Sequence, residues 1–300
     1  MNRKNQNKKI TPDKAIGFVD IFCSASVSEQ SNVENLLMPS LERLSGGNNI
    51  CLHLVDYSGT NKLAVKESQT ISVTVHKNNK RLGFGAAHNF LFDQVHPKSF
   101  FLIINPDIYC NAALVEELLS ASKKIEDIGI VEARQLPYEH PKGYDAQTME
   151  TNWASGSCML LNPKFYNEVG GFDENFWMYC EDVDLSWRAW LSGYRVIHCP
   201  EAVAYHYTGG FFEYRDDRFY FEQLWGGVNY LYLSYKYWGN LRLWLSIIIL
   251  MRQNLPKSLK QAIFREFQSR KRTYRRTKGY SLSLHSQKDK VGIVNYNCYK

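Results

Sequence analysis

The chain has 300 residues, of which 44% are hydrophobic and 22% are charged, so it can bury a sizeable core in one large domain or in one domain with an appendage. Its net charge of +6 is unevenly distributed, because the residues from Lys257 onward carry twelve Lys/Arg against two acids and the first 256 residues carry a net charge of −4. An acidic body would repel a nucleic-acid backbone, and the basic tail contains no recognisable nucleic-acid-binding motif. We therefore expect no nucleic-acid partner.

The cysteines and the N-terminus favour a cytoplasmic protein. Seven cysteines are scattered along the chain and include no Cys-x-x-Cys pair, which argues against a disulfide framework and against a zinc site. The first residues, MNRKNQNKKITPDK, are polar and basic with no apolar run behind them, so a secretory signal of ordinary form is not expected. Residues 1–14 are expected to form a flexible N-terminus.

Short β-branched runs alternate with helical patterns over the first hundred residues. Strands are expected over 16–23, 50–56, 71–75 and 100–104, and helices over 33–44 and 85–94. This alternation is typical of a parallel α/β sheet. Ligands of such sheets bind beyond the carboxyl ends of the strands, so the residues after each strand are the candidates for chemistry.

Two aspartates follow strands in this region. Asp107 comes after the wholly apolar run Phe-Phe-Leu-Ile-Ile, so its carboxylate should be held at a rigid sheet end. A carboxylate completed by phosphate oxygens and water is a usual way to bind Mg²⁺ or Mn²⁺, and a structural aspartate in a proline turn is an equal alternative. Asp56 could accept a hydrogen bond from the imide N–H of uracil or thymine, or it could cap a helix suggested over 61–67.

A glycine-containing loop lies between these aspartates. The segment from Arg81 to Asn89, RLGFGAAHN, places Gly83 and Gly85 before a helix, and glycines let backbone approach a ligand closely. A nicotinamide-binding fingerprint would need a third glycine where His88 stands and a strand directly before the first glycine, so that interpretation is disfavoured.

Three acids, Glu181, Asp182 and Asp184, open a predicted helix. Apolar residues follow at helical spacing, namely Val183, Trp187 and Trp190/Leu191. The helix should therefore pack on the core, and a carboxylate at its start can be positioned rather than merely solvated. Asp184 is expected to pair with Arg188 at the i,i+4 spacing.

Aromatic residues and a histidine flank this helix. Trp177 and Tyr179 could form a platform for a sugar ring, or they could pack at the rim of the core. His206 ends a predicted strand and has equal claims to a structural and to a functional role.

Four segments in order resemble the family 2 glycosyltransferases of the GT-A fold, in particular their rhamnosyltransferase-like branch. They are LVDYSGT, NKRLGFGAAHN, INPDI, and GGFDENFWMYCEDVDLSWRAWLSGYRV followed by the histidine of AYHYTGG. The resemblance implies an α/β GT-A catalytic domain over 15–210, with a mostly parallel sheet flanked by helices. An aromatic and basic helical appendage over 211–278 and a poorly ordered tail over 279–300 complete the expected organisation.

The resemblance also implies roles for individual residues. Asp182 would be the general base, with Glu181 beside it, and Asp107 with His206 would hold Mg²⁺ or Mn²⁺. Asn105 stands where many members have a first aspartate, which leaves one carboxylate of the Asp-x-Asp motif. Nucleotide-sugar contacts are expected from Asp56, Arg81, Gly83, Gly85, Asn89, Asn105 and Asp107, and acceptor contacts from Asp173, Glu174, Trp177 and Tyr179.

The implied reaction is transfer of a sugar, with inversion, from a nucleotide-diphosphate donor to a hydroxyl of a glycan or lipid-linked oligosaccharide in cell-surface polysaccharide synthesis. Rhamnose from dTDP-rhamnose is the favoured donor by resemblance. A sugar-nucleotide-binding relative without turnover and a nucleotidyltransferase are the alternatives, although the Cys-Ser-Ala-Ser-Val after the first strand lacks the glycine-rich loop of the latter.

The region over 211–278 is rich in aromatic and basic residues. Its longest uncharged run, residues 223–235, is thirteen residues and the aliphatic run over 243–251 is nine, both below the roughly 20 needed to cross a bilayer. Tyr and Trp favour the headgroup interface, and basic residues are drawn to anionic lipid, so this region is expected on the inner leaflet at the cytoplasmic face. A helical appendage packed on the catalytic domain is the alternative.

Overall fold

The structure, a computed structural model, describes residues 19–44, 49–140, 142–207, 216–274 and 290–291. The expected flexible N-terminus over 1–14 lies outside these residues. Of the expected tail over 279–300, only Lys290 and Val291 are described, and the Lys290 ammonium lies 2.8 Å from a Glu150 carboxylate oxygen.

The fold is built on one eight-stranded mixed sheet in the order β3-β2-β1-β4-β7-β6-β8-β5. The pairs β3/β2, β2/β1, β1/β4 and β6/β8 are parallel, and β4/β7, β7/β6 and β8/β5 are antiparallel. The strands are β1 (Val19–Ala25), β2 (Ile50–Asp56), β3 (Ser72–His76), β4 (Phe101–Ile104), β5 (Ile108–Cys110), β6 (Ile128–Leu136), β7 (Cys158–Leu161) and β8 (Arg195–His206).

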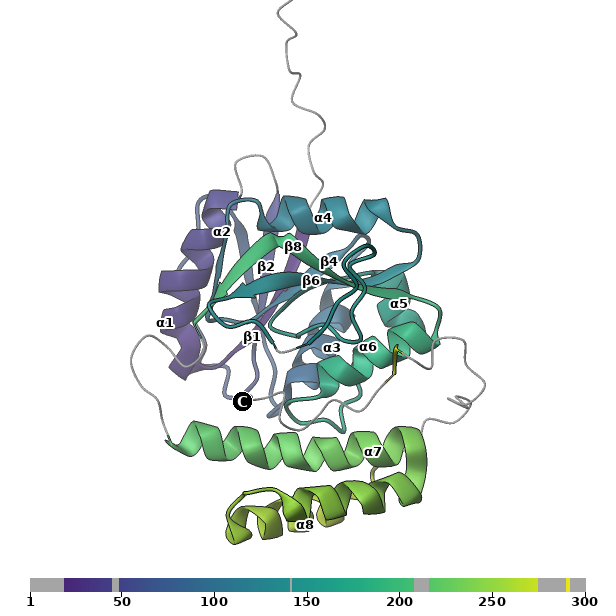
Figure 1. Ribbon diagram of the computed structural model, residues 1–300. Helices are drawn as coiled ribbons and strands as arrows, with labels where there is room; N and C mark the ends of the chain where they lie inside the picture. Colours follow the sequence, from purple (N-terminus) through teal and green to yellow (C-terminus); the bar gives the residue numbers. More distant parts are fainter. Residues whose placement is uncertain (1–18, 45–48, 141, 208–215, 275–289, 292–300) are drawn as a thin grey trace, which may run out of the picture.

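Helices cover both faces of the sheet. After a 3-10 turn, η1 (Val27–Glu29), one helical stretch comprises α1 (Gln30–Asn32), the π-helical η2 (Val33–Leu37) and α2 (Met38–Leu44). The others are α3 (Phe84–Val95), α4 (Leu114–Lys124), α5 (Pro163–Glu168), α6 (Glu181–Leu191), α7 (Asp216–Arg252) and α8 (Lys257–Arg270). Figure 1 shows the sheet between these helices, with α7 and α8 as a further layer below.

The core has two halves because alternate residues of a strand point to opposite faces. In β4, Leu102 and Ile104 join the cluster formed with η2, α2 and α4, whereas Phe101 and Ile103 join the cluster formed with α3, α5, α6, α7 and α8. All four side chains are fully buried. A wholly apolar strand is therefore required here, as the sequence predicts.

The last two helices form an antiparallel layer that begins with a folded-back α7. Gly239 interrupts α7 with φ 75° and ψ −159°, a conformation that glycine adopts without a steric penalty. The Ser234 and Ser246 hydroxyls on either side of it lie 2.8 Å apart, so residues 240–252 run back along the preceding segment. The helix assigned as one element thus consists of two segments, 216–238 and 240–252.

Most elements expected in the first hundred residues are confirmed. β2 matches its prediction residue for residue, β3 shifts by one residue, and β4 begins one residue later than expected. The pairs among β1, β2, β3 and β4 are parallel. The helix suggested over 61–67 is absent, since these residues form an irregular segment. Every antiparallel pair includes β5 or β7 from later in the chain, and these strands make the expected mostly parallel sheet a mixed one.

Candidate active site

The candidate residues meet at one edge of the sheet. β4 and β6 both run antiparallel to β7, and β8 runs parallel to β6, so β1, β2, β4, β6 and β8 share one direction. Their carboxyl ends therefore lie at the same edge, which carries Asp56, the turn over 105–107, Gln135 and His206. The segment over 154–157, which enters β7, begins at this edge too.

Asp107 and His206 are in direct contact. His206 Nε2 lies 3.2 Å from Asp107 Oδ1, and His206 Nδ1 lies 3.2 Å from the Gln135 amide oxygen. The contact follows from the sheet, because Ile108 pairs with His206 where β5 meets β8 and the Tyr207 amide donates to the Asp107 carbonyl. The two residues predicted to bind metal are thus brought together.

The 154–157 segment connects this pair to the acids of α6. The Asn105 amide donates to the Ser157 carbonyl at 2.9 Å, and the Gly156 amide donates to Asp182 Oδ2 at 2.9 Å. A short path of backbone and two hydrogen bonds therefore joins the turn of Asp107 to Asp182. The two carboxylates lie on the same side of the molecule.

Asp182 is positioned at the first turn of α6. Its Oδ1 accepts from its neighbour, the Val183 amide, at 2.8 Å, while Oδ2 accepts from Gly156. The residue is half-buried, and burial raises the pKa of Asp182 above its ordinary value, with the two backbone donors acting in the opposite direction. A fixed carboxylate with a raised proton affinity is suited to accepting a proton.

Glu181 differs from Asp182 in having a carboxylate oxygen without a partner. The residue is 5% exposed, and Oε2 is buried with no hydrogen-bond partner. Burial, reinforced by the negative charge of Asp182, raises the pKa of Glu181 well above its ordinary value. A buried carboxyl group without a partner is stabilised when it binds a ligand or retains its proton.

The residues just before the acids have a strained backbone that α7 holds in place. Tyr179 and Cys180 have φ values of 71° and 66°, which non-glycine residues adopt at a cost and usually where surrounding structure enforces them. The Asn229 side-chain amide of α7 donates to the carbonyls of Met178 and Tyr179 at 2.7 and 2.8 Å. Asn229 thus fixes the turn that delivers Glu181 and Asp182.

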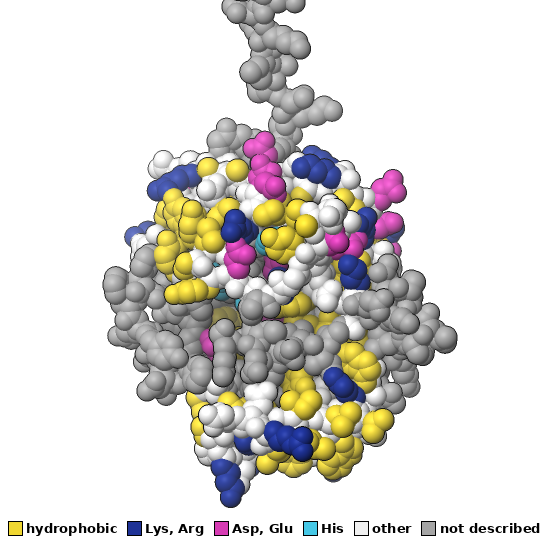
Figure 2. Space-filling view, viewed as in Figure 1, with side chains coloured by type: hydrophobic (Ala, Val, Ile, Leu, Met, Phe, Trp, Pro, Cys, Tyr) yellow, Lys and Arg dark blue, Asp and Glu magenta, His cyan; other side chains and the backbone are white. Residues whose placement is uncertain are grey.

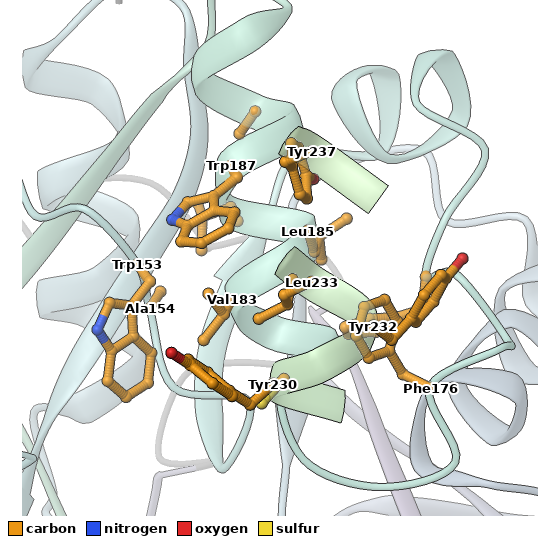
Figure 3. Packing of buried hydrophobic residues seen from close by; sticks show 14 of the residues in the cluster. Trp153, Ala154, Phe176, Val183, Leu185, Trp187, Tyr230, Tyr232, Leu233 and Tyr237 are labelled. Atoms are coloured by element: carbon orange, nitrogen blue, oxygen red, sulfur yellow. The ribbon is translucent and has the colours of Figure 1, made fainter. Parts of the chain in front are cut away.

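Apolar packing supports the same contact between α6 and α7. Figure 3 shows Val183, Leu185 and Trp187 of α6 beside Tyr230 and Leu233 of α7. The Trp187 and Tyr237 rings meet edge to face with their centroids 5.0 Å apart. The acids therefore stand at the end of a rigid aromatic interface.

Asp173 is held in a buried ion cluster. Lys236 of α7 lies 2.6 Å from both Asp173 Oδ2 and Asp184 Oδ1, and Asp184 Oδ2 lies 2.8 Å from Arg188 Nε. The pairing of Asp184 with Arg188 is confirmed. Although burial alone would raise the pKa of Asp173, the Lys236 ammonium outweighs it and lowers that pKa to about 2. Both carboxylate oxygens of Asp173 already have hydrogen-bond partners within the chain. The contact of Asp173 with an acceptor stays a prediction.

The glycine loop packs against the segment that precedes α6. A Cβ on Gly83 would lie 2.3 Å from the Trp177 carbonyl oxygen, and one on Gly85 would lie 2.7 Å from the Phe172 Cβ. Asn89 donates to Phe172 and to a Glu174 carboxylate oxygen. Gly83 and Gly85 thus allow two parts of the chain to pack closely together. Their predicted contact with a ligand stays a prediction.

The remaining candidates lie at the rim of the same region. The Arg81 guanidinium carbon lies 5.4 Å from the centre of the half-buried Trp177 ring. Asp56 is buried, and its two oxygens accept hydrogen bonds from Ser58, Thr60 and the Lys62 amide. Asp56 therefore shapes its own loop without capping a helix, and its contact with a nucleobase stays a prediction.

A second polar network, centred on Glu132 of β6, escaped the sequence analysis. Glu132 Oε1 lies 2.5 Å from Lys142 Nζ and accepts from the Ser155 amide at 2.7 Å, while Oε2 lies 3.2 Å from His198 Nδ1. His140 approaches the Ser155 hydroxyl at 3.1 Å. The network fixes the segment whose next residue donates to Asp182. A charged residue inside the strand IGIVEARQL was the available signal for it.

The Asp107 and His206 pair fits a divalent cation. The Gln135 amide oxygen faces His206 Nδ1, and in the tautomer that donates to it the Nε2 lone pair faces a carboxylate oxygen. Two facing acceptors are satisfied by a cation or a proton between them. No larger cluster of His, Cys, Asp or Glu ligands occurs among the described residues, so diphosphate oxygens and water would complete the coordination.

Comparison with known proteins defines the class of fold. No family model matches the chain. Among solved structures, GalNAc-T7 with UDP, GalNAc and Mn²⁺ is similar with a TM-score of 0.57 at 12% identity, over 87% of this chain and 56% of that chain. The mixed sheet with its flanking helices is the GT-A glycosyltransferase fold, which confirms the expected fold class.

Two curated relatives are similar over a short stretch. The N-acetylglucosaminyl-diphospho-decaprenol L-rhamnosyltransferase of Mycobacterium tuberculosis is 39% identical over 74 residues, which make up 25% of this chain and 21% of the relative. Rhamnosyltransferase WbbL of Escherichia coli K12 is 38% identical over 72 residues, 24% of this chain and 25% of the relative. The matched part therefore spans about a fifth to a quarter of these relatives. The chain thus has the GT-A fold and is similar to these rhamnosyltransferases over about a quarter of its length.

Proposed function

We propose that the protein is an inverting glycosyltransferase in polysaccharide synthesis, with Asp182 as the general base. One observation carries the proposal: a half-buried carboxylate with a raised pKa stands at the same sheet edge as the pair of Asp107 and His206. Transfer from a nucleotide-diphosphate sugar needs a proton acceptor on one side of the sugar and charge neutralisation on the other. The arrangement of these three residues supports both.

Asp182 would take the proton of the acceptor hydroxyl as that oxygen attacks the anomeric carbon. Its two backbone donors keep the carboxylate aimed, because neither oxygen can turn away without losing a hydrogen bond. Glu181, whose Oε2 has no hydrogen-bond partner within the chain, would help to orient the acceptor or the base. A single displacement of this kind inverts the anomeric centre.

Asp107 and His206 would bind Mg²⁺ or Mn²⁺ at the donor. When bound, the cation would neutralise the negative charge that develops on the departing diphosphate. Gln135 holds the His206 ring so that Nε2 faces the cation site. The similar GalNAc-T7 structure contains Mn²⁺ together with UDP, which supports a divalent cation in this fold.

The finer assignment is transfer of rhamnose from dTDP-rhamnose to a lipid-linked glycan at the cytoplasmic face of the inner membrane. Its support is the similarity to two proteins named as rhamnosyltransferases, one of which is named for a diphospho-decaprenol acceptor. No helix among the described residues is long and apolar enough to span a bilayer. An inner-leaflet contact would therefore be made by surface residues.

The test is a screen of UDP-, dTDP- and GDP-sugars with Mg²⁺ or Mn²⁺, scored by sugar transfer and by nucleotide release. We expect one nucleotide to be preferred and Asp182→Asn to lower turnover about 100- to 10,000-fold with donor affinity unchanged. The exposed Asp93 of α3 provides the control, Asp93→Asn, which should retain full activity.

Two results would contradict the proposal. Turnover of the Asp182→Asn protein within a few-fold of the unsubstituted protein would remove Asp182 as the base. Tight donor binding with no transfer to any glycan acceptor would favour a binding protein without turnover, and release of pyrophosphate would favour a nucleotidyltransferase.

A further inference from the structure

The exposed apolar side chains of the protein gather on one surface. Seven of the eleven large hydrophobic side chains that are exposed among the described residues lie on the returning segment of α7 and on α8. Six of them lie on the returning segment of α7, residues 240–252, where Leu241 is 78% and Trp244 is 64% exposed. The members of this apolar stripe are Leu241, Trp244, Leu245, Ile248, Ile249 and Met251, and α8 adds Phe264.

The spacing of the apolar stripe shows that it is a second face of the helix. Its members recur three or four residues apart, whereas Leu243, Ser246 and Leu250 on the opposite side are buried. A surface helix of a globular protein ordinarily pairs one apolar stripe with a polar face. The returning segment of α7 has apolar residues on its buried face and on its exposed face. The exposed stripe has no partner within the described part of the chain.

Cations surround the stripe. From Gly239 to Tyr274 the chain has eight Lys/Arg and one acid, Glu266, which is itself paired with Arg270 at 2.6 Å. Several of the cations are exposed, among them Arg252, Lys257, Arg265 and Arg272. Figure 2 shows hydrophobic and basic side chains together over this lower layer of the molecule. Charge of one sign around exposed apolar residues favours an anionic partner that has an apolar interior.

We propose that the apolar stripe and its basic rim dock the protein on the surface of an anionic lipid bilayer. The stripe would enter the boundary between headgroups and acyl chains, with Trp244 at the depth that indole favours, and the cations would contact lipid phosphates. The returning segment spans thirteen residues, 240–252, which suits a helix lying in the interface rather than one that crosses.

Docking on lipid is argued from the apolar stripe and its basic rim, and its link to a lipid-linked acceptor rests on the proposed function. The first segment of α7 packs on α6 and contacts the turn before the acids through Asn229, while the returning segment carries the stripe. One helix therefore joins the docking surface to the candidate active site. A lipid-linked acceptor would be met by a protein already held at the bilayer.

The test is flotation of the full chain with vesicles of phosphatidylethanolamine and phosphatidylglycerol, compared with vesicles of phosphatidylcholine alone. We expect binding to the anionic vesicles that weakens as salt is raised. The triple substitution Trp244→Ser, Leu245→Ser and Ile248→Ser should lower the partition coefficient at least about tenfold. Removing cations by Lys257→Gln, Arg265→Gln and Arg272→Gln should lower it about fivefold for each charge.

Matched controls separate docking from folding and from catalysis. Val27→Ser with Tyr138→Ser removes exposed apolar side chains from the catalytic body and should leave flotation unchanged. The Asp182→Asn protein should float like the unsubstituted protein, so a failure of the proposed reaction would not affect this result. All variants of the docking surface are substituted at exposed positions, and equal thermal unfolding would confirm that they fold.

Three outcomes would overturn the proposal. The first is failure of the unsubstituted protein to float, and the second is flotation of the apolar triple variant equal to that of the unsubstituted protein. The third is a dimer, seen by sedimentation without lipid, that the triple variant converts to a monomer while vesicles bind neither protein. That result would assign the stripe to a contact between two copies of the chain.

Discussion

Glu181 is the most unusual residue of the candidate site, because it is buried beside a second acid and one of its oxygens has no partner. Its pKa in the folded protein is raised well above the ordinary 4.5 by burial and then by the charge of Asp182. The folded protein therefore retains a proton that the unfolded chain releases above about pH 4.5. The contribution of this group to stability is fully present below that pH and is lost as the pH rises toward the folded-state pKa.

Substituting Glu181 should remove the loss of stability that its buried carboxyl group causes at high pH. We expect Glu181→Gln to be more stable than the unsubstituted protein at pH 8 by about 1–3 kcal/mol, because the neutral amide has no raised pKa and each pKa unit is worth about 1.4 kcal/mol, and to show a smaller fall in stability between pH 5 and pH 8. Denaturant unfolding at the two pH values measures the difference. Glu67→Gln, at an exposed site, is the control for the change in charge, and parallel pH slopes for all three proteins would refute the expectation.

Metal binding at the sheet edge is a second prediction at the scale of residues. Asp107→Ala should weaken metal-dependent donor binding at least about tenfold, and Gln135→Leu should weaken it about 10- to 100-fold by releasing the orientation of His206. Titration calorimetry with and without Mn²⁺ measures this effect. Donor affinity that does not respond to either substitution would show that Asp107 and His206 do not bind the metal. Asp93→Ala supplies a carboxylate-loss control away from the site.

At the scale of elements, α7 is a positioning element for α6. Asn229 donates to two carbonyls of a turn in which Tyr179 and Cys180 have positive φ. A backbone conformation of this kind costs on the order of 1–3 kcal/mol for each residue and persists only while surrounding contacts enforce it. Loss of these hydrogen bonds would let the turn relax and shift the first turn of α6.

We expect Asn229→Ala to lower the free energy of unfolding by about 1–3 kcal/mol and to lower acceptor-dependent turnover more than donor affinity. Ser234→Ala is the matched control, because Ser234 is buried on the same helix and its hydroxyl bonds to Tyr230 and Ser246 within α7. Turnover and donor binding are measured for both variants. If the two variants lose turnover equally, Asn229 acts through general stability and has no positioning role.

The local pattern predicted the elements that carry the site. The apolar run before Asp107 fixed β4, and the apolar spacing behind the acids predicted α6 and its pairing of Asp184 with Arg188. These features depend on neighbours within a few positions of the chain. Prediction failed at 61–67, where Asp56 bonds to its own loop and no helix forms.

Contacts between distant residues could not be predicted in this way. Asn229 lies 51 positions from Met178, and Lys236 lies 63 positions from Asp173. No periodicity in either segment specifies such a pairing, because both residues occur in an aromatic helix whose docking depends on three-dimensional packing. The fold of α7 back on itself depends on a single residue, Gly239, whose positive φ a sequence pattern does not reveal.

At the scale of the whole molecule, the docking surface and the active site share α7, so a bilayer should affect the reaction selectively. We expect anionic vesicles to raise the rate with a lipid-linked acceptor about tenfold or more through a higher local concentration. The rate with a water-soluble acceptor should stay unchanged. Initial rates at increasing vesicle concentration measure both. An equal rise for both acceptors would indicate a general activation instead.

The buried cluster of Asp173, Asp184, Arg188 and Lys236 has a consequence for how the chain can vary. Its two acids and two bases cancel, and the base in the middle belongs to α7 while the other three charges belong to the catalytic body. Exchange of Lys236 alone for a neutral residue would strand a negative charge in the interior, at a cost of about 3–5 kcal/mol. Natural drift at these sites should therefore proceed by paired replacement. A shortened chain that stops before α7 should leave two acids with a single base and uncover the apolar face of α6, so it should aggregate.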